Sequence, residues 1–114
     1  MAITTVNAVY SGTGPAKSGQ IIASLLSGDG SRALEGACTA TGDAASSTFL
    51  CNWIDGTEVL PFTPSGMLCQ RSGGAATSTI QVTSCVPTDT TKFTVTADGT
   101  INAATFIVSF RVWK

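Results

Sequence analysis

Short apolar segments alternate along the chain with clusters of Gly, Asp, Ser and Pro. The segments are rich in Val, Ile, Thr and Phe and recur about every ten to fifteen residues. This spacing is typical of an all-β sandwich or barrel, so the sequence predicts one compact domain, jelly-roll-like or immunoglobulin-like, over residues 1–114. About eight antiparallel strands are predicted, over 3–10, 20–27, 32–41, 47–54, 58–62, 79–86, 92–97 and 100–113, with a short extra piece at 67–70.

One dipeptide is the clearest turn signal. Asp98-Gly99 lies between KFTVTA and TINAATFIVSF, and Asp-Gly favours the type I′ turn, in which both central residues have positive φ. We therefore expect a hairpin from Lys92 to Val112 to be the most secure part of the fold, with Phe93 and Val95 helping the last strand to cover a core. Further turn candidates are Gly28–Ser31, Gly42-Asp43 and Asp55-Gly56.

Some segments leave other outcomes open. Residues 19–28 and 31–40 compete as helices, because Ala and Leu favour helix. Ser11–Ser18 contains Gly and Pro and is predicted to be a loop, so residues 1–18 are a candidate N-terminal arm and loop. Gln70–Ser78, which is also rich in Gly, is predicted to be the most mobile loop.

The last strand has two different faces. Alternate side chains point to opposite faces of a strand, so one face is apolar and forms core: Phe106, Val108, Phe110 and Val112. The other face has the composition of an interface, in which Trp and Arg are enriched. With Tyr10 from the N-terminal arm, Ile107, Arg111 and Trp113 are the candidate interface residues. Alternatively, Trp113 lies across the end of a small sandwich.

Composition excludes most reaction chemistry. The chain has no histidine and only 11% charged residues, whereas histidine is the most common general acid or base and metal ligand. A nucleophile needs an adjacent base, and the candidates are isolated carboxylates and three lysines. We therefore expect no enzymatic activity, no cofactor and no catalytic metal. The lysines are Lys17, Lys92 and Lys114.

The acidic residues have simpler explanations than catalysis or calcium binding. Asp55 and Glu58 form a conceivable carboxylate pair, but they flank a turn signal. Asp29 and Asp98 precede glycine and lie in no calcium-binding motif. The net charge is −1, and the charged residues are spread along the chain without runs. No nucleic-acid partner is therefore expected. No apolar run approaches the length of a membrane span, and the sequence predicts a soluble protein.

The four cysteines are the main cluster of special residues. Cys38, Cys51, Cys69 and Cys85 lack the close spacing of zinc ligands. If residues 32–41 and 47–54 pair as a hairpin, Cys38 and Cys51 lie nearly opposite one another, which favours a Cys38–Cys51 bridge and leaves Cys69 to pair with Cys85. The alternative is four buried, reduced cysteines acting as small apolar groups.

Two classes of function fit these features. The first is an extracellular carbohydrate-binding or adhesion module, secreted or at the cell surface. In this class Tyr10, Trp53 and Trp113 would form an exposed aromatic platform, with at least two of the rings coplanar and facing solvent. The second is a structural protein that assembles on a larger surface. The first residues do not form a secretory signal, so either a signal has been removed or the chain never uses one.

The start MAITTVNAVY, the repeated turn signals and the final TFIVSFRVWK are similar to those of the small β-rich head decoration or cementing proteins of tailed bacteriophages. The resemblance implies a virion structural protein, extracellular after release, with capsid or other virion proteins as partners and a small homo-oligomer as its state. It also implies a contact element at Ala2–Ser11 or Phe106–Lys114. Disulfides without a signal fit a virion protein, because host lysis brings it into oxidising surroundings.

Overall fold

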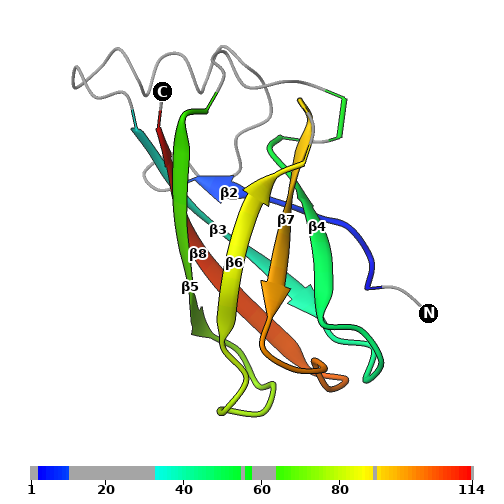
Figure 1. Ribbon diagram of the computed structural model, residues 1–114. Coiled ribbons are helices and arrows are strands. Elements are labelled where there is room, and N and C mark those ends of the chain that lie inside the picture. The colour runs from blue at the N-terminus through cyan, green and yellow to red at the C-terminus, as the bar shows by residue number, and fades with distance from the viewer. Residues whose placement is uncertain (1–2, 11–32, 55, 58–63, 89, 114) are drawn as a thin grey trace.

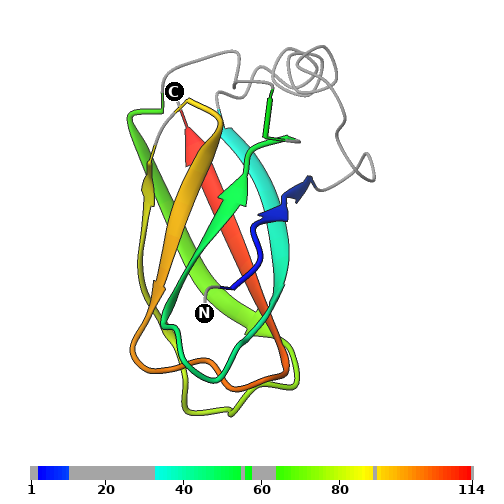
Figure 2. The same ribbon diagram turned by 90° about the vertical axis from the view of Figure 1, so that its right-hand side faces the viewer.

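The computed structural model describes residues 3–10, 33–54, 56–57, 64–88 and 90–113. In these ranges the chain is all-β without a helix, and its strands form two layers (Figures 1 and 2). Sheet A has the order β1 (Val6–Asn7), β4 (Thr48–Asn52), β7 (Lys92–Ala97) and β6 (Val82–Pro87). Sheet B has the order β2 (Val9–Tyr10), β3 (Ala33–Thr41), β8 (Thr105–Trp113) and β5 (Gly66–Gly73).

The strand count and the pairing differ in part from the prediction. β1 and β2 are two-residue pieces of one segment that is interrupted at Ala8, so seven segments, not eight, form the described strands. The two sheets do not close into a barrel. β1 runs parallel to β4, whereas the other strand pairs are antiparallel as predicted.

The apolar alternation of the sequence determines which side chains form the core. In β8, Phe106, Val108 and Val112 are completely buried, and Phe110 is nearly so. β7 contributes Phe93 and Val95 from the opposite sheet, also completely buried. Each fully buried side chain of this size contributes about 1.5–3 kcal/mol. The predicted core face of the last strand is therefore confirmed.

An aromatic cluster fills the space between the sheets. The Trp53 ring centroid lies 4.5 Å from that of Phe93 and 6.1 Å from that of Phe110. The rings of Phe93 and Phe110 are 5.0 Å apart at 55°, which brings residues of both sheets together. Such aromatic pairs contribute about 0.5–1.5 kcal/mol beyond their buried area.

The predicted hairpin from Lys92 to Val112 is wrong. β7 lies in sheet A and β8 in sheet B, and the intervening loop changes sheets. Neither Asp98 nor Gly99 has positive φ. Asp98 instead extends the pairing of β6 and β7, because its carboxylate accepts a hydrogen bond from the amide of Gln81 at 3.0 Å. The apolar faces of β7 and β8 meet across the core, where side chains of the two inner faces interdigitate.

The predicted hairpin of residues 32–41 and 47–54 is also wrong. β3 pairs with β8, and β4 pairs with β7, so the loop between them again changes sheets. Gly42 approaches the loop before β8 so closely that a Cβ there would lie 2.0 Å from the Asn102 carbonyl oxygen. The amide of Ala44 donates to the Ile101 carbonyl at 2.9 Å. The two loops that change sheets therefore support one another.

Asp43 shapes the first of these loops. One of its carboxylate oxygens accepts hydrogen bonds from the amides of Ala45 at 2.9 Å and Ser46 at 2.7 Å. These bonds, and one from the Ser46 hydroxyl, lower the pKa of Asp43. The turn chemistry predicted for Gly42-Asp43 is present, with the positive φ at Ala44 (61°).

The structure corrects two further predictions, on residues 31–40 and 67–70. Residues 33–41 form a strand, so the helical alternative over 31–40 is wrong. The short extra piece predicted at 67–70 is part of β5, an eight-residue edge strand. The predicted strands at 20–27 and 58–62, and the helical alternative over 19–28, lie outside the described residues.

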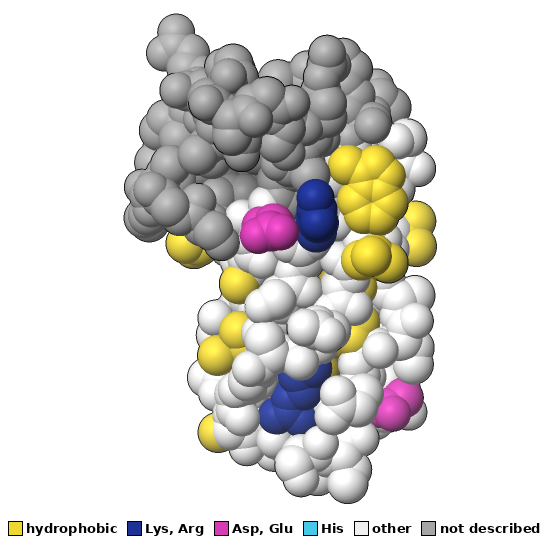
Figure 3. Space-filling model, turned by 90° about the vertical axis from the view of Figure 1, so that its left-hand side faces the viewer, with side chains coloured by type: hydrophobic (Ala, Val, Ile, Leu, Met, Phe, Trp, Pro, Cys, Tyr) yellow, Lys and Arg dark blue, Asp and Glu magenta, His cyan; other side chains and the backbone are white. Residues whose placement is uncertain are grey.

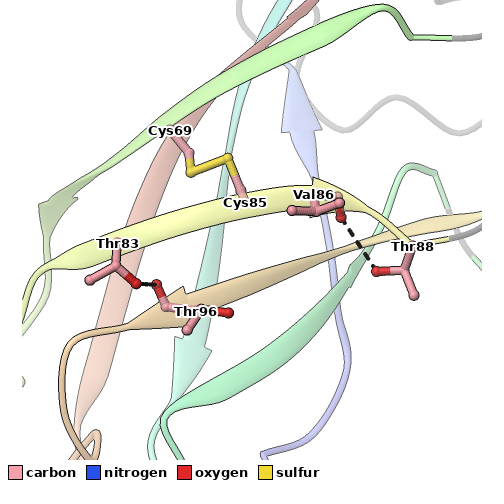
Figure 4. Close-up of a disulfide and its surroundings, with 6 residues drawn as sticks. All are labelled: Cys69, Thr83, Cys85, Val86, Thr88 and Thr96. Atoms are coloured by element: carbon pink, nitrogen blue, oxygen red, sulfur yellow. Dashed lines mark hydrogen bonds between the residues drawn. A yellow bond between two sulfur atoms is a disulfide. The ribbon is translucent and has the colours of Figure 1, made fainter.

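Both open sides of the sandwich are closed by covalent connections. On one side, a disulfide joins Cys69 of β5 to Cys85 of β6, with a Cα–Cα distance of 6.3 Å (Figure 4). On the other side, the N-terminal segment pairs with β4 through β1 and with β3 through β2. Ala8, at the crossing point, is 2% exposed and donates its amide to the Asn52 carbonyl. Val6–Tyr10 is thus part of both sheets and not a separate arm, whereas residues 11–18 lie outside the description.

Arg71 organises the loop between β5 and β6. Its guanidinium stacks on the Phe106 ring, 4.9 Å from the centroid. Its nitrogens donate hydrogen bonds of 2.5–3.2 Å to five backbone carbonyls at the end of β5 and in the loop that leads to β6. Four of these carbonyls lie in Gln70–Ser78, the loop predicted to be most mobile, and the fifth is that of Ile80. The planar guanidinium has five N–H donors in a fixed geometry, so one side chain can bind the whole loop. The carbonyls are those of Gly73, Gly74, Ala76, Thr77 and Ile80.

Replacing Cys69 and Cys85 together with Ala should lower the free energy of unfolding by about 3 kcal/mol. The bridge spans a sequence separation of 16 residues, and closing a loop of that size removes about this much free energy from the unfolded state. Urea unfolding of the variant measures the loss, and the wild-type chain in reductant should show a similar one. An unchanged unfolding midpoint in both would contradict a stabilising bridge.

Replacing Arg71 with Met should destabilise the protein by about 2–3 kcal/mol, because hydrogen bonds to a charged group contribute about 1.5–3 kcal/mol each and water replaces several of them. Arg71→Lys is the matched control: it keeps the charge but not the fork of donors. We expect its loss to be intermediate in urea unfolding, with faster amide hydrogen exchange at Ala76 and Ile80 in both variants. Equal stability of all three proteins would show that the hydrogen bonds do not hold the loop.

Candidate functional site: the outer face of sheet B

The outer face of sheet B carries the predicted interface residues of β8. Ile107, Ser109, Arg111 and Trp113 alternate with the core residues and point away from the core, as predicted. Tyr10 lies in β2 opposite Gly36, at the edge of the same sheet, but its side chain is not described. Strand register therefore assembles one surface from four strands.

This surface is hollowed into an open groove of about 630 Å³. Ala37 and Ser109 are opposite one another in the register and leave a shallow floor, because both side chains are small. Two exposed apolar side chains form the walls: Val9 of β2 is 46% exposed and Leu68 of β5 is 66% exposed. Apolar groups exposed together around a hollow are characteristic of interaction sites.

An acidic and a basic side chain line the same groove. Glu35 of β3 and Arg111 of β8 are cross-strand neighbours, with 4.0 Å between Glu35 Oε1 and Arg111 Nε. Their side chains are 64% and 57% exposed, respectively. Such an exposed pair contributes about 0–1 kcal/mol to stability. Figure 3 shows a neighbouring acidic and basic pair with hydrophobic side chains beside it on this side of the molecule.

Trp113 has an intramolecular role. It lies opposite Gly66 of β5, and a Cβ at Gly66 would be 2.5 Å from its ring. The indole therefore packs directly on the glycine backbone and covers this part of the sheet. Trp113 is half-buried and does not line the groove, whose large exposed apolar side chains are Val9 and Leu68.

The groove includes residues that the sequence did not indicate. Glu35 and Leu68 flank Arg111 on its two sides, because β3 and β5 are the neighbours of β8. Val9 enters through the pairing of β2 with β3. These three residues lie close together because of the strand order, and no local sequence pattern reveals which strands are neighbours.

The aromatic platform of the carbohydrate-binding alternative does not form as three exposed rings. Trp53 is 1% exposed and packs in the core. Trp113 packs on Gly66. Trp53 therefore contributes no surface to a platform.

The cysteines divide into one bridge and one buried pair. The predicted Cys69–Cys85 disulfide is confirmed. Cys38 and Cys51 are free thiols, buried in β3 and β4 of opposite sheets, so the predicted Cys38–Cys51 bridge is not present. They do not face one another as hairpin partners but across the core. A hydrogen bond with Cys38, together with burial, raises the pKa of the Cys51 thiol well above its usual range.

The other sequence candidates do not form a site in the described ranges. Lys17, Asp29, Asp55, Glu58 and Lys114 lie outside them. Among residues that the structure describes, no group of three or more His, Cys, Asp or Glu side chains could hold a metal ion. The same residues include no helix long and apolar enough to cross a membrane.

Comparison with known proteins found no matching family model, no matching curated protein and no matching solved structure.

Thiol titration should distinguish the two cysteine pairs. We expect no reaction of the native protein with a thiol reagent, because both free cysteines are buried and the reagent cannot reach them. After unfolding without reductant, two thiols per chain should react, and peptide mapping should locate them at Cys38 and Cys51. Four reactive thiols would contradict the Cys69–Cys85 bridge, and none would show that the buried pair is oxidised.

Proposed function

We propose that this chain is a non-enzymatic virion structural protein, which decorates or cements a bacteriophage capsid as a small homo-oligomer. The observation that carries the proposal is the groove on sheet B, where Val9 and Leu68 are exposed around a hollow beside Glu35 and Arg111. Burying such a surface stabilises an assembly by about 25 cal/mol per Å² of apolar area.

Repetition strengthens contacts of this kind. A single small contact is weak, but linked contacts around a shell raise the effective concentration of each subunit at its site. The closed sandwich suits this role, because its edges are joined by the disulfide and the N-terminal segment. The disulfide is compatible with a virion or other extracellular location.

The order of the strand pairs supports a jelly-roll winding of the sandwich in preference to an immunoglobulin-like one. β3 pairs with β8, β4 pairs with β7, and the disulfide joins β5 to β6, so each pair is nested inside the previous one along the chain. Jelly rolls recur among viral capsid domains.

The experiment compares two matched surface variants. Leu68→Asp places a charge on the outer face of sheet B, and Val86→Asp places the same charge on sheet A, where Val86 is 56% exposed. Both should fold. Mass spectrometry of purified virions should find Val86→Asp at the wild-type level and Leu68→Asp reduced at least about tenfold, since an aspartate in an apolar contact must be desolvated.

Equal incorporation of the two variants would show that this face is not used. Absence of the wild-type chain from purified virions would overturn the proposed function. Deletion of Ala2–Ser11 is a poorer test, because it removes β1, β2 and the buried Ala8 and so opens one side of the sandwich.

A further inference from the structure

We infer that the groove on sheet B binds the same face of a second copy of this chain, in a two-fold symmetric dimer. The inference rests on the proposed function and names the partner within its homo-oligomer. A two-fold interface brings one surface against itself, so that surface must contain both halves of every complementary contact. The outer face of sheet B meets this condition in charge, and it exposes apolar side chains that the contact would bury.

The charges are self-complementary. Glu35 and Arg111 are neighbours on one surface, each more than half exposed, and 4.0 Å is the limit of an ion pair. Their mutual contact leaves most of the carboxylate and guanidinium accessible. In a two-fold dimer, Glu35 of each copy faces Arg111 of the other, which forms two ion pairs of the same kind. A partner of one predominant charge would be attracted to one of these groups and repelled by the other.

The apolar side chains of this face lie beside the charged pair. Leu68 is opposite Arg111 in the register of β5 and β8, and Val9 lies along the groove over Ala37 and Ser109. Packing this face against a second copy removes both exposed side chains from water.

The opposite face of the sandwich lacks a pair of opposite charges in its described strands. The described outward positions of sheet A are mostly Thr, Ser and Asn, with Val86 exposed in β6. Lys92 is the one charged residue of these strands, so they hold no carboxylate that could face Lys92 of a second copy. The charges therefore favour sheet B for self-association, and Lys92 provides a control position.

The test reverses the charge at Glu35 in one variant and at Arg111 in another, and then mixes the two variants. Glu35→Arg gives the face two positive charges, and Arg111→Glu gives it two negative ones. Analytical ultracentrifugation should find the wild-type chain in equilibrium between 11.6 kDa and twice that mass. Each single variant alone should dimerise at least about tenfold more weakly, because like charges then face one another. An equimolar mixture of the two should dimerise again, as a heterodimer.

Lys92→Glu changes the same amount of charge as Arg111→Glu on the other face and should dimerise like the wild type. Circular dichroism of each variant confirms folding, which we expect because both substituted side chains are more than half exposed. A wild-type chain that remains monomeric up to millimolar concentration would overturn the inference. So would single variants that dimerise like the wild type, or a mixture that fails to recover.

These outcomes are distinct from those of the proposed function. A chain that is monomeric in solution but present in purified virions would overturn the dimer alone. A chain that dimerises with the expected charge dependence but never enters virions would overturn the capsid role alone.

Discussion

The structure depends on the closure of both open sides of a two-layer sandwich. Two stacked sheets bury their apolar faces only while they stay aligned, and their edge strands offer unpaired backbone groups to other chains. Here the edges are joined in pairs: β5 to β6 by the Cys69–Cys85 bridge, and β1 to β2 by the continuous chain through Ala8. A small domain with little charge is therefore held around one core by connections between the sheets on both sides.

Contacts between loops at one end of the sandwich also hold the two sheets together. The connections β3–β4 and β7–β8 both change sheets, and their backbones bond to one another where Gly42 approaches Asn102. At the same end of the sandwich, Arg71 binds the carbonyls of the β5–β6 loop while stacking on Phe106. A residue type usually assigned to solvent or to ligands thus acts as an internal support.

The outer faces of the two sheets are the surfaces on which side chains can meet other molecules. The two faces differ: sheet A presents mostly hydroxyl and amide side chains with Val86 exposed in β6, whereas sheet B presents Leu68 and Val9 around a hollow beside Glu35 and Arg111. That difference is the physical basis of the proposal that assembly uses sheet B. Burial of Trp53 removes one of the three rings that the carbohydrate-binding alternative offered for its platform.

The sequence by itself determined the all-β class and the inward and outward faces of β8, because alternation along a strand is a local property. The Cys69–Cys85 pair was predicted correctly but from a wrong premise, the Cys38–Cys51 bridge of a hairpin that does not form. It did not determine which strands are neighbours. Both expected hairpins were wrong, since Asp98-Gly99 and Gly42-Asp43 mark turns without specifying whether the next strand joins the same sheet or the other. Only the tertiary structure places Glu35 and Leu68 beside Arg111, and Cys38 across the core from Cys51, because strand order is decided by long-range burial of apolar faces.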